Sequence, residues 1–75
     1  MTRMIVHYSF PRGANRVRSK LRKGLYDAGL EWDRIAKFEG RKLNAHEVAG
    51  ALEAVQEAVI NGAPTHHVWL LIDED

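Results

Sequence analysis

The spacing of the hydrophobic residues alternates along the chain between a two-residue and a helical period, and this order restricts the fold more than any other feature. Residues Met4 to Phe10 alternate as in a strand with one buried face. One face carries Val6, Tyr8 and Phe10, and the other carries Ile5, His7 and Ser9. Pro11 lacks an amide hydrogen and Gly13 favours a turn, so we expect the strand to stop there.

A helical period follows from about Ala14 to Ala28, with Gly29 as a left-handed C-cap. The apolar face of this predicted helix consists of Val17, Leu21, Leu25 and Ala28. Gly24 sits beside that face. A glycine there either weakens the helix or lets another backbone approach closely.

The next segment, Leu30 to Phe38, suits a strand that Arg34 interrupts and in which Ile35 points the other way. Its main face would carry Leu30, Trp32, Ala36 and Phe38. We expect a hairpin turn at Glu39-Gly40 and a short returning strand over Arg41 to Leu43.

Asn44 and Glu47 form a variant of the capping box, which predicts that a second helix begins there. Its expected apolar stripe consists of Ala45, Val48, Leu52, Val55 and Val59. Asn61-Gly62 should end this helix, since Pro64 prevents its continuation.

The last predicted strand, His67 to Ile72, is apolar from Val68 onward without alternation. Such a strand is usually covered on both faces or paired in the interior of a larger sheet. Together the elements predict one domain over residues 1–75 with an α/β (α+β) fold of the ferredoxin-like type, β-α-β-(β)-α-β. Both helices would pack on one face of a sheet of about three or four strands. Without the returning strand, a three-stranded parallel α/β unit would remain.

The small size of the chain favours self-association as a source of stability. Its 75 residues lie near the lower limit for independent folding, and the absence of cysteine excludes disulfides and thiolate metal sites. A homodimer would supply the missing stability and would cover open sheet edges. Without cysteine, without an apolar run of the ~20 residues that span a bilayer, and without a secretory signal, we expect a cytoplasmic protein that binds no membrane.

The net charge of +1 conceals an uneven distribution of charge. The candidate binding residues are the basic ones of the first third: Arg12, Arg16, Arg18, Lys20, Arg22 and Lys23. They would lie on both flanks of the outward-facing Ser19 and could neutralise phosphates of nucleic acid or another anionic surface. The acidic residues of the second half are Glu47, Glu53, Glu57, Asp73, Glu74 and Asp75. These acidic residues could dock onto a protein partner, or they could be ordinary surface charges that keep the protein soluble. The basic residues likewise have a simpler interpretation, as the solvated face of a helix.

We find no pattern that predicts a catalytic residue, a metal or a cofactor. His66 and His67 are adjacent and would point to opposite faces of a strand, so they cannot easily share a metal. Ser9 has no recognisable base, and no phosphate-binding loop is present. We expect Trp32 and Trp69 to lie in the core rather than at an interface.

Several segments are similar to those of a known family. They are the strand Ile5 to Phe10, the Arg-rich first helix, Phe38-Glu39-Gly40 followed by Leu43, the capped second helix and the closing apolar strand. In this order they resemble the small ferredoxin-fold subunit of the CRISPR adaptation complex and its relatives of the virulence-associated protein D type. The resemblance covers nearly the whole chain through short motifs, and it implies the fold and a homodimer.

Two departures separate the chain from the active members of that family. Where the family has an aspartate that holds a divalent metal across the dimer, this sequence has Ser9. The family's further C-terminal strand, which pairs with the partner subunit, is also missing here. The resemblance therefore implies nuclease activity less strongly than it implies the fold.

Three hypotheses follow. The first is a non-catalytic homodimer that binds nucleic acid or a nucleoprotein complex through the basic first helix. The second is a protein-binding inhibitor encoded by a mobile element, of the anti-CRISPR type, which occludes an effector subunit. The third is a metal-dependent ribonuclease, which Ser9 disfavours because a serine cannot supply the charge that such a metal requires.

Overall fold

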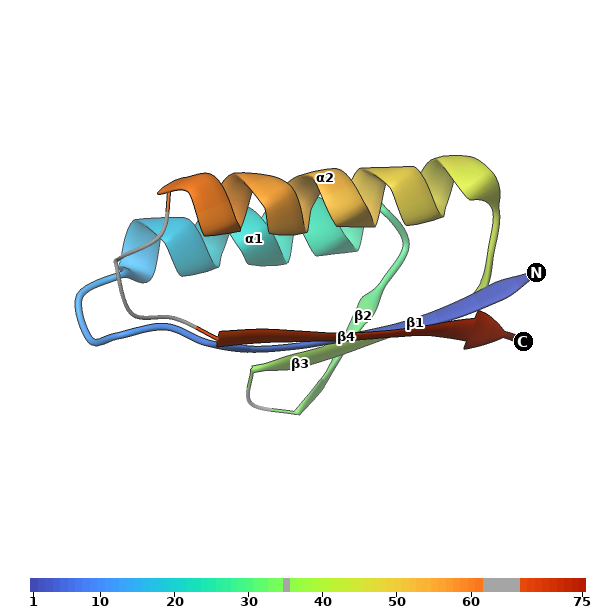
Figure 1. Cartoon of the computed structure of the whole chain (residues 1–75), viewed down its shortest axis with the longest axis horizontal. Helices are drawn as coiled ribbons and strands as arrows, with labels where there is room; N and C mark the ends of the chain where they lie inside the picture. The colour runs from blue at the N-terminus through green and yellow to red at the C-terminus, as the bar shows by residue number, and fades with distance from the viewer. Residues whose placement is uncertain (35, 62–66) are drawn as a thin grey trace.

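The computed structural model describes residues 1–34, 36–61 and 67–75, and its elements follow the order expected of a ferredoxin-like domain (Figure 1). They are β1 (Thr2–Ser9), α1 (Asn15–Asp27), β2 (Glu31–Arg34), β3 (Lys37–Leu43), α2 (Ala45–Asn61) and β4 (His67–Glu74). The predictions made above for Ile35, Gly62, Pro64 and His66 lie outside the described residues.

The strands form one sheet in the order β2-β3-β1-β4, in which every neighbouring pair is antiparallel. Both helices cover the same face of this sheet, and no helix formed by the described residues lies on the other face (Figure 1). The predicted α+β class and the two-helix layer are confirmed, and so is the additional strand, so that the three-stranded parallel alternative is wrong.

Strand β1 alternates as its sequence predicts. Met4, Val6 and Tyr8 point toward the helices and are at most 4% exposed, whereas His7 and Ser9 are exposed on the open face. Phe38 of β3 completes the centre of the core, because it lies opposite Val6 and is fully buried.

Helix α1 ends in the predicted left-handed glycine. Gly29 has a φ of +94°, and the N–H of Leu30 donates to the carbonyl of Leu25 over 3.0 Å, which is the Schellman pattern. Gly24 is a point of close approach between the helices: a Cβ at this position would lie 2.6 Å from the Cβ of Ala54 in α2. The second interpretation of Gly24, close approach of a neighbouring backbone, is therefore confirmed.

The predicted hairpin turn at Glu39-Gly40 is wrong, because both residues lie inside β3. The chain turns earlier, at Ala36, which has a φ of +60°. Gly40 has a packing role instead. A Cβ there would lie 2.9 Å from Cγ of Leu30 and 3.0 Å from Cδ1 of Leu43, so only a glycine leaves these leucines their room.

Helix α2 begins with the predicted capping box. The backbone N–H of Asn44 donates to Glu47 Oε1 over 2.8 Å, and the backbone N–H of Glu47 donates to Asn44 Oδ1 over 2.9 Å. The predicted apolar stripe is wrong in part, since Leu52 and Val59 are 38% and 44% exposed. The buried residues of α2 are Ala51, Val55 and Ala58. Small residues line the contact with α1, and this close packing turns the larger apolar residues outward.

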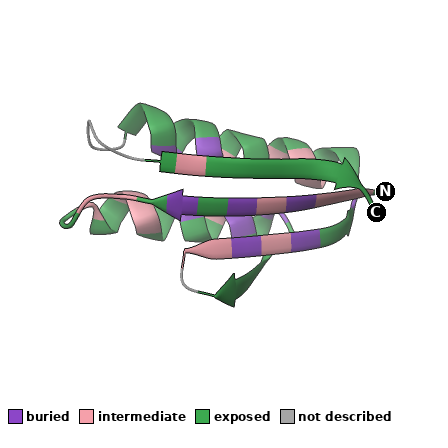
Figure 2. Cartoon of the chain, turned by 60° about the horizontal axis from the view of Figure 1, so that its bottom comes forward, coloured by how far each residue is buried: buried purple, intermediate pink, exposed green. Residues whose placement is uncertain are grey.

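Strand β4 departs most from expectation. It pairs with β1 along its whole length, yet it lies at the edge of the sheet instead of in its interior. Every residue of β4 except Val68 is exposed (Figure 2). Trp69 and Trp32 are 54% and 53% exposed, so the expectation that both tryptophans belong to the core is wrong. Both residues lie on edge strands, which a four-stranded sheet leaves open.

The end of the chain is tied to the sheet. Arg3 donates two hydrogen bonds to the Asp73 carboxylate, over 3.0 and 2.7 Å. The amide of Lys42 donates to an Asp75 carboxylate oxygen, and the Asp75 amide donates to the carbonyl of Met1 over 3.1 Å. Within the described residues, neither helix has the length and apolar character that crossing a membrane demands.

Candidate nucleic-acid interface

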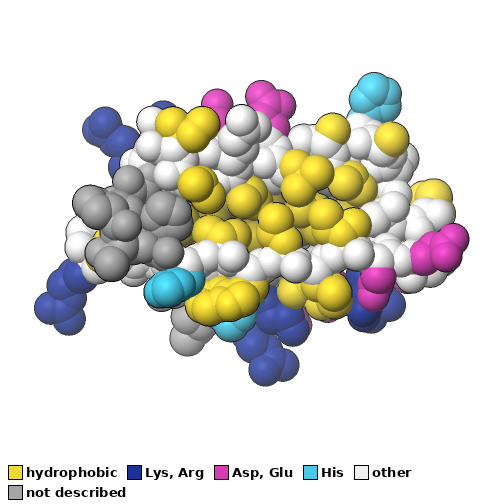
Figure 3. Space-filling model, in the orientation of Figure 1, with side chains coloured by type: hydrophobic (Ala, Val, Ile, Leu, Met, Phe, Trp, Pro, Cys, Tyr) yellow, Lys and Arg dark blue, Asp and Glu magenta, His cyan; other side chains and the backbone are white. Residues whose placement is uncertain are grey.

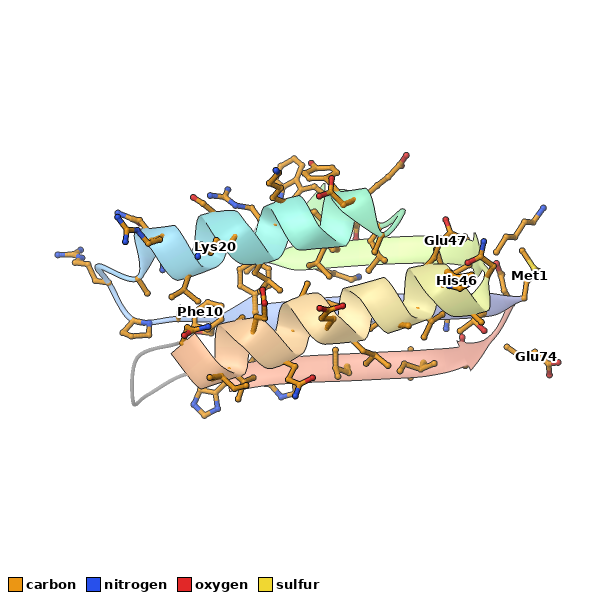
Figure 4. All side chains as sticks on the ribbon, turned by 90° about the horizontal axis from the view of Figure 1, so that it is seen from above. Met1, Phe10, Lys20, His46, Glu47 and Glu74 are labelled. Carbon is orange, nitrogen blue, oxygen red and sulfur yellow. The ribbon has the colours of Figure 1, made fainter. Side chains whose placement is uncertain are left out.

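Helix α1 presents its basic residues on the side away from the sheet. Five of the six predicted binding residues are exposed: Arg12, Arg16, Lys20, Arg22 and Lys23. Arg16 and Lys20 line the groove between α1 and α2, which Glu57 also lines, and Figure 4 shows Lys20 on α1. Arg22 lies on the other flank of α1, close enough to the buried Tyr8 for its positive charge to lower the pKa of the phenol. The structure thus gathers the predicted residues on one helix and the turn before it.

The basic residues of the sheet differ from those of α1 in their partners. Those of the sheet with an acidic partner within ion-pair distance are Arg3 with Asp73, Arg34 and Lys37 with Asp33, and Arg41 with Glu39 and Asp75. Within residues 1–34, 36–61 and 67–75, none of the six basic residues around α1 forms such a pair. The charge of α1 is therefore uncompensated at short range.

Arg18 has a structural role within this set. Its guanidinium donates to the carbonyl of Pro11 over 3.2 Å, to the carbonyl of Phe10 over 3.5 Å and to the side chain of Asn15. These bonds hold the turn between β1 and α1 against the first turn of the helix. Arg18 thereby fixes the place of Arg12 and is less available to a ligand than its neighbours.

Tyr8 lies near the flank of α1 that carries Arg18 and Arg22. Its burial raises the pKa of the phenol, and the positive charges of Arg22 and Arg18 lower it in part. The hydroxyl therefore stays protonated in the neutral range. The buried phenol near the two guanidinium groups is therefore a neutral group and not a reactive anion.

Much of the acidic second half of the chain is already engaged. Glu47 caps α2, Asp75 binds the Lys42 amide, and hydrogen bonds from Arg3 lower the pKa of the Asp73 carboxyl. The continuous acidic surface suggested by the composition is reduced to scattered groups on α2 and the last strand.

The described residues contain no group of three or more side chains of the kinds that bind metals. Ser9, at the position of the family's metal-binding aspartate, is exposed and pairs with His67 of β4.

One cluster escaped the sequence analysis. On the open face of the sheet, the ring centroid of Trp69 lies 5.3 Å from that of His7 and 5.6 Å from that of His67, and the latter pair is stacked at 18°. The signal was present as aromatic residues at alternate positions of two strands. It was missed because Trp69 was assigned to the core and the histidines were considered only as metal ligands.

No protein-family model, no curated protein and no solved structure matches the chain. A proposal for its function therefore depends on the geometry and the charges of its own residues.

Proposed function

We propose that this protein is a small, non-catalytic nucleic-acid-binding protein that works as a homodimer and contacts phosphates through α1. The observation that carries the proposal is the set of basic residues on and before α1 that lack an ion pair, next to sheet residues of the same type that have one. On the sheet, by contrast, the ammonium group of Lys37 lies 3.2 Å from a carboxylate oxygen of Asp33.

The dimensions of α1 suit a phosphate backbone. From Arg16 to Lys23 the helix rises about 10 Å. A duplex carries one negative charge per about 1.7 Å of its axis with both strands counted, so a duplex segment of this length carries roughly six phosphate charges on its two strands. A helix packed on a sheet holds its basic residues in fixed relative positions, which reduces the ordering cost of binding.

Fluorescence anisotropy with labelled duplex DNA and with labelled single-stranded RNA tests the proposal. If about five phosphates are neutralised, the logarithm of the binding constant should fall with the logarithm of the salt concentration with a slope of about −4.5 for the duplex and about −3.5 for the single strand. No binding at low salt to either probe would overturn the proposal.

A pair of charge-matched variants places the site. Lys20→Glu with Lys23→Glu removes positive charge from α1, and we expect it to reduce the salt slope by about 2 and to weaken binding strongly. Arg34→Glu with Lys42→Glu makes the same change of net charge on the sheet and should leave most of the affinity. Equal losses in both variants would mean that only net charge matters, and would refute a site on α1.

The aromatic cluster provides a further discriminating variant. Single strands often bind through stacking of their bases on exposed aromatic rings. If Trp69→Ala abolishes RNA binding while the α1 variant leaves it intact, the open face of the sheet is the site and the proposal for α1 fails.

The alternative of a protein-binding inhibitor depends on the small size, the single domain, the lack of a catalytic constellation and an acidic surface. The anchoring of Asp73 and Asp75 leaves less of that surface available, and the nucleic-acid proposal has the stronger support for this reason.

A further inference from the structure

Strand β4 is a long, unprotected edge. On the helix side Leu70 and Ile72 are 44% and 46% exposed, and on the open face Trp69 and Leu71 are 54% and 46% exposed. Proteins usually protect a free edge with charges, prolines, bulges or a short strand. The opposite edge strand, β2, follows this rule, because it has four residues, EWDR, of which all but one are charged. Strand β4 has eight residues and an apolar centre, which is typical of a strand with a partner.

An apolar groove runs along the helix side of β4. The exposed apolar residues of the two elements on either side include Leu52 and Val59 of α2 and Leu70 and Ile72 of β4, all at least 38% exposed. Figure 3 shows the hydrophobic surface as a continuous band between the ribbon positions of α2 and β4. The groove and the free edge are contiguous, so one partner could cover both.

The free backbone groups of β4 belong to every second residue. The Asp75 amide donates to the carbonyl of Met1, in the same register in which β1 and β4 pair throughout. In an antiparallel ladder, hydrogen-bonded pairs alternate with pairs that are not hydrogen-bonded. The N–H and C=O groups of Val68, Leu70 and Ile72 therefore point away from β1, to the outer edge.

The charges of β4 select an antiparallel second copy as the partner. The strand carries His67 at its start and the acidic residues Asp73 and Glu74 at its end. Two parallel copies would place the acidic ends side by side, whereas two antiparallel copies bring each acidic end to the histidine of the other. Like charges directly opposite each other across a strand pair are destabilising, which disfavours the parallel arrangement.

The faces of the strand then restrict the register. Residues opposite each other share a face, so even-numbered residues must meet even-numbered ones. A register centred on Leu70 pairs apolar with apolar residues at the centre and keeps the acidic residues apart: Leu70 lies opposite Leu70 of the second copy, Val68 opposite Ile72, Trp69 opposite Leu71, and His67 opposite Asp73. A register centred on Leu71 would instead set Trp69 against Asp73 and Val68 against Glu74.

We propose that β4 pairs with β4 of a second copy, antiparallel and centred on Leu70, in a symmetric homodimer. The two four-stranded sheets join into one continuous sheet, and the helices of both copies lie on the same side of it. The two apolar grooves become neighbours along the symmetry axis. Each would help to cover the exposed leucine and isoleucine side chains of the other copy.

Sedimentation velocity of the chain without nucleic acid tests the association. We expect a species of twice the chain mass of 8.5 kDa that dissociates on dilution. Leu70→Arg places two positive charges opposite each other at the symmetry axis and should abolish the dimer. Trp32→Arg changes another exposed apolar residue, on the other edge strand, and should leave the dimer intact, with far-UV circular dichroism reporting the fold of both variants.

Single cysteines in this cysteine-free chain test the register. In the proposed dimer the two copies of residue 70 face each other with Cα atoms about 5.5 Å apart, within the range of about 4.4–6.8 Å that a disulfide spans. Leu70→Cys should therefore form a covalent dimer on oxidation. Ile72→Cys should not, since its two copies lie four residues apart along the strands, about 13 Å.

A monomer at all concentrations, a Leu70→Arg variant that stays dimeric, or cross-linking of Ile72→Cys as readily as Leu70→Cys would each overturn the inference. Because no nucleic acid takes part in these measurements, such a result would leave the proposed role of α1 to be judged separately.

Discussion

The contact between Gly24 of α1 and Ala54 of α2 leads to a prediction in which two opposing effects can be weighed. Gly24→Ala improves helix propensity by about 1 kcal/mol. The new Cβ would, however, lie 2.6 Å from that of Ala54. The helices must then move apart by about 1 Å to reach the normal carbon–carbon separation of about 3.5 Å. Overpacking of this kind costs about 1–3 kcal/mol, so we expect a net loss of about 1 kcal/mol.

Gly50→Ala is the matched control. Gly50 also lies within a helix, but a Cβ there would lie 3.5 Å from that of Ala28, an ordinary contact. This variant should gain about 1 kcal/mol from propensity alone. The two substitutions have the same chemistry and should differ by about 2 kcal/mol in the free energy of unfolding, with opposite signs relative to the unchanged chain.

Urea unfolding followed by far-UV circular dichroism measures the difference, at one fixed protein concentration because the proposed dimerisation would add to the apparent stability. In thermal unfolding the Gly24→Ala variant should lose about 4–8 °C. Combining Gly24→Ala with Ala54→Gly restores the space and should return the stability close to its starting value. If Gly24→Ala stabilises as much as Gly50→Ala, the helices are not in close contact and the packing argument fails.

Three further predictions concern the rest of the fold. Arg3 lowers the pKa of Asp73 in the folded state, so on acidification the unfolded chain takes up a proton at this carboxylate before the folded chain does. The contribution of Asp73 to the free energy of unfolding is therefore complete above the unfolded pKa of about 4. It is lost as the pH falls through the lowered pKa of the folded state. Asp73→Asn should flatten the acid limb of a stability–pH profile, and an unchanged limb would contradict this. Asn44→Ala removes the cap of α2 and should cost about 1 kcal/mol in urea unfolding. Gly40→Ala should cost about 1–3 kcal/mol, because its Cβ would meet Leu30 at 2.9 Å; a neutral effect in the same assay would show that this site has room.

The parts of the fold that the sequence predicted correctly depend on local signals. The alternation in β1 and the capping box of Asn44 and Glu47 each involve residues within a few positions of one another. The left-handed Gly29 is equally local, since it ends α1 through its own backbone. Such signals require no knowledge of the neighbouring elements.

The errors occurred where tertiary packing decided. Gly40 was taken for a turn residue, but it lies within β3 and leaves room for Leu43 of the same strand and for Leu30, which precedes β2. The inward face of α2 is set by the close approach of Gly24 and Ala54, which a helical period cannot reveal. For Trp69, hydrophobicity predicted burial, and only the strand order placed it at an open edge.

The candidate site was predictable in part. The cluster of basic residues on α1 is visible in the sequence, but the availability of each residue is not. Arg18 is occupied by the carbonyls of the preceding turn, and Arg3 is offset by Asp73, which only the pairing of β1 with β4 brings near. The choice between these sets needed the three-dimensional arrangement.

The hydrogen bond between the Asp75 amide and the Met1 carbonyl has a practical consequence for engineering the protein. Met1 and Glu74 lie at the same end of the molecule (Figure 4), so a short linker could join the ends and permit a circular permutant. Any polypeptide fused to either end would leave the domain from that one corner. A bulky fusion there would stand beside the last residues of β4, whereas the basic residues at the start of α1 would remain at the far end.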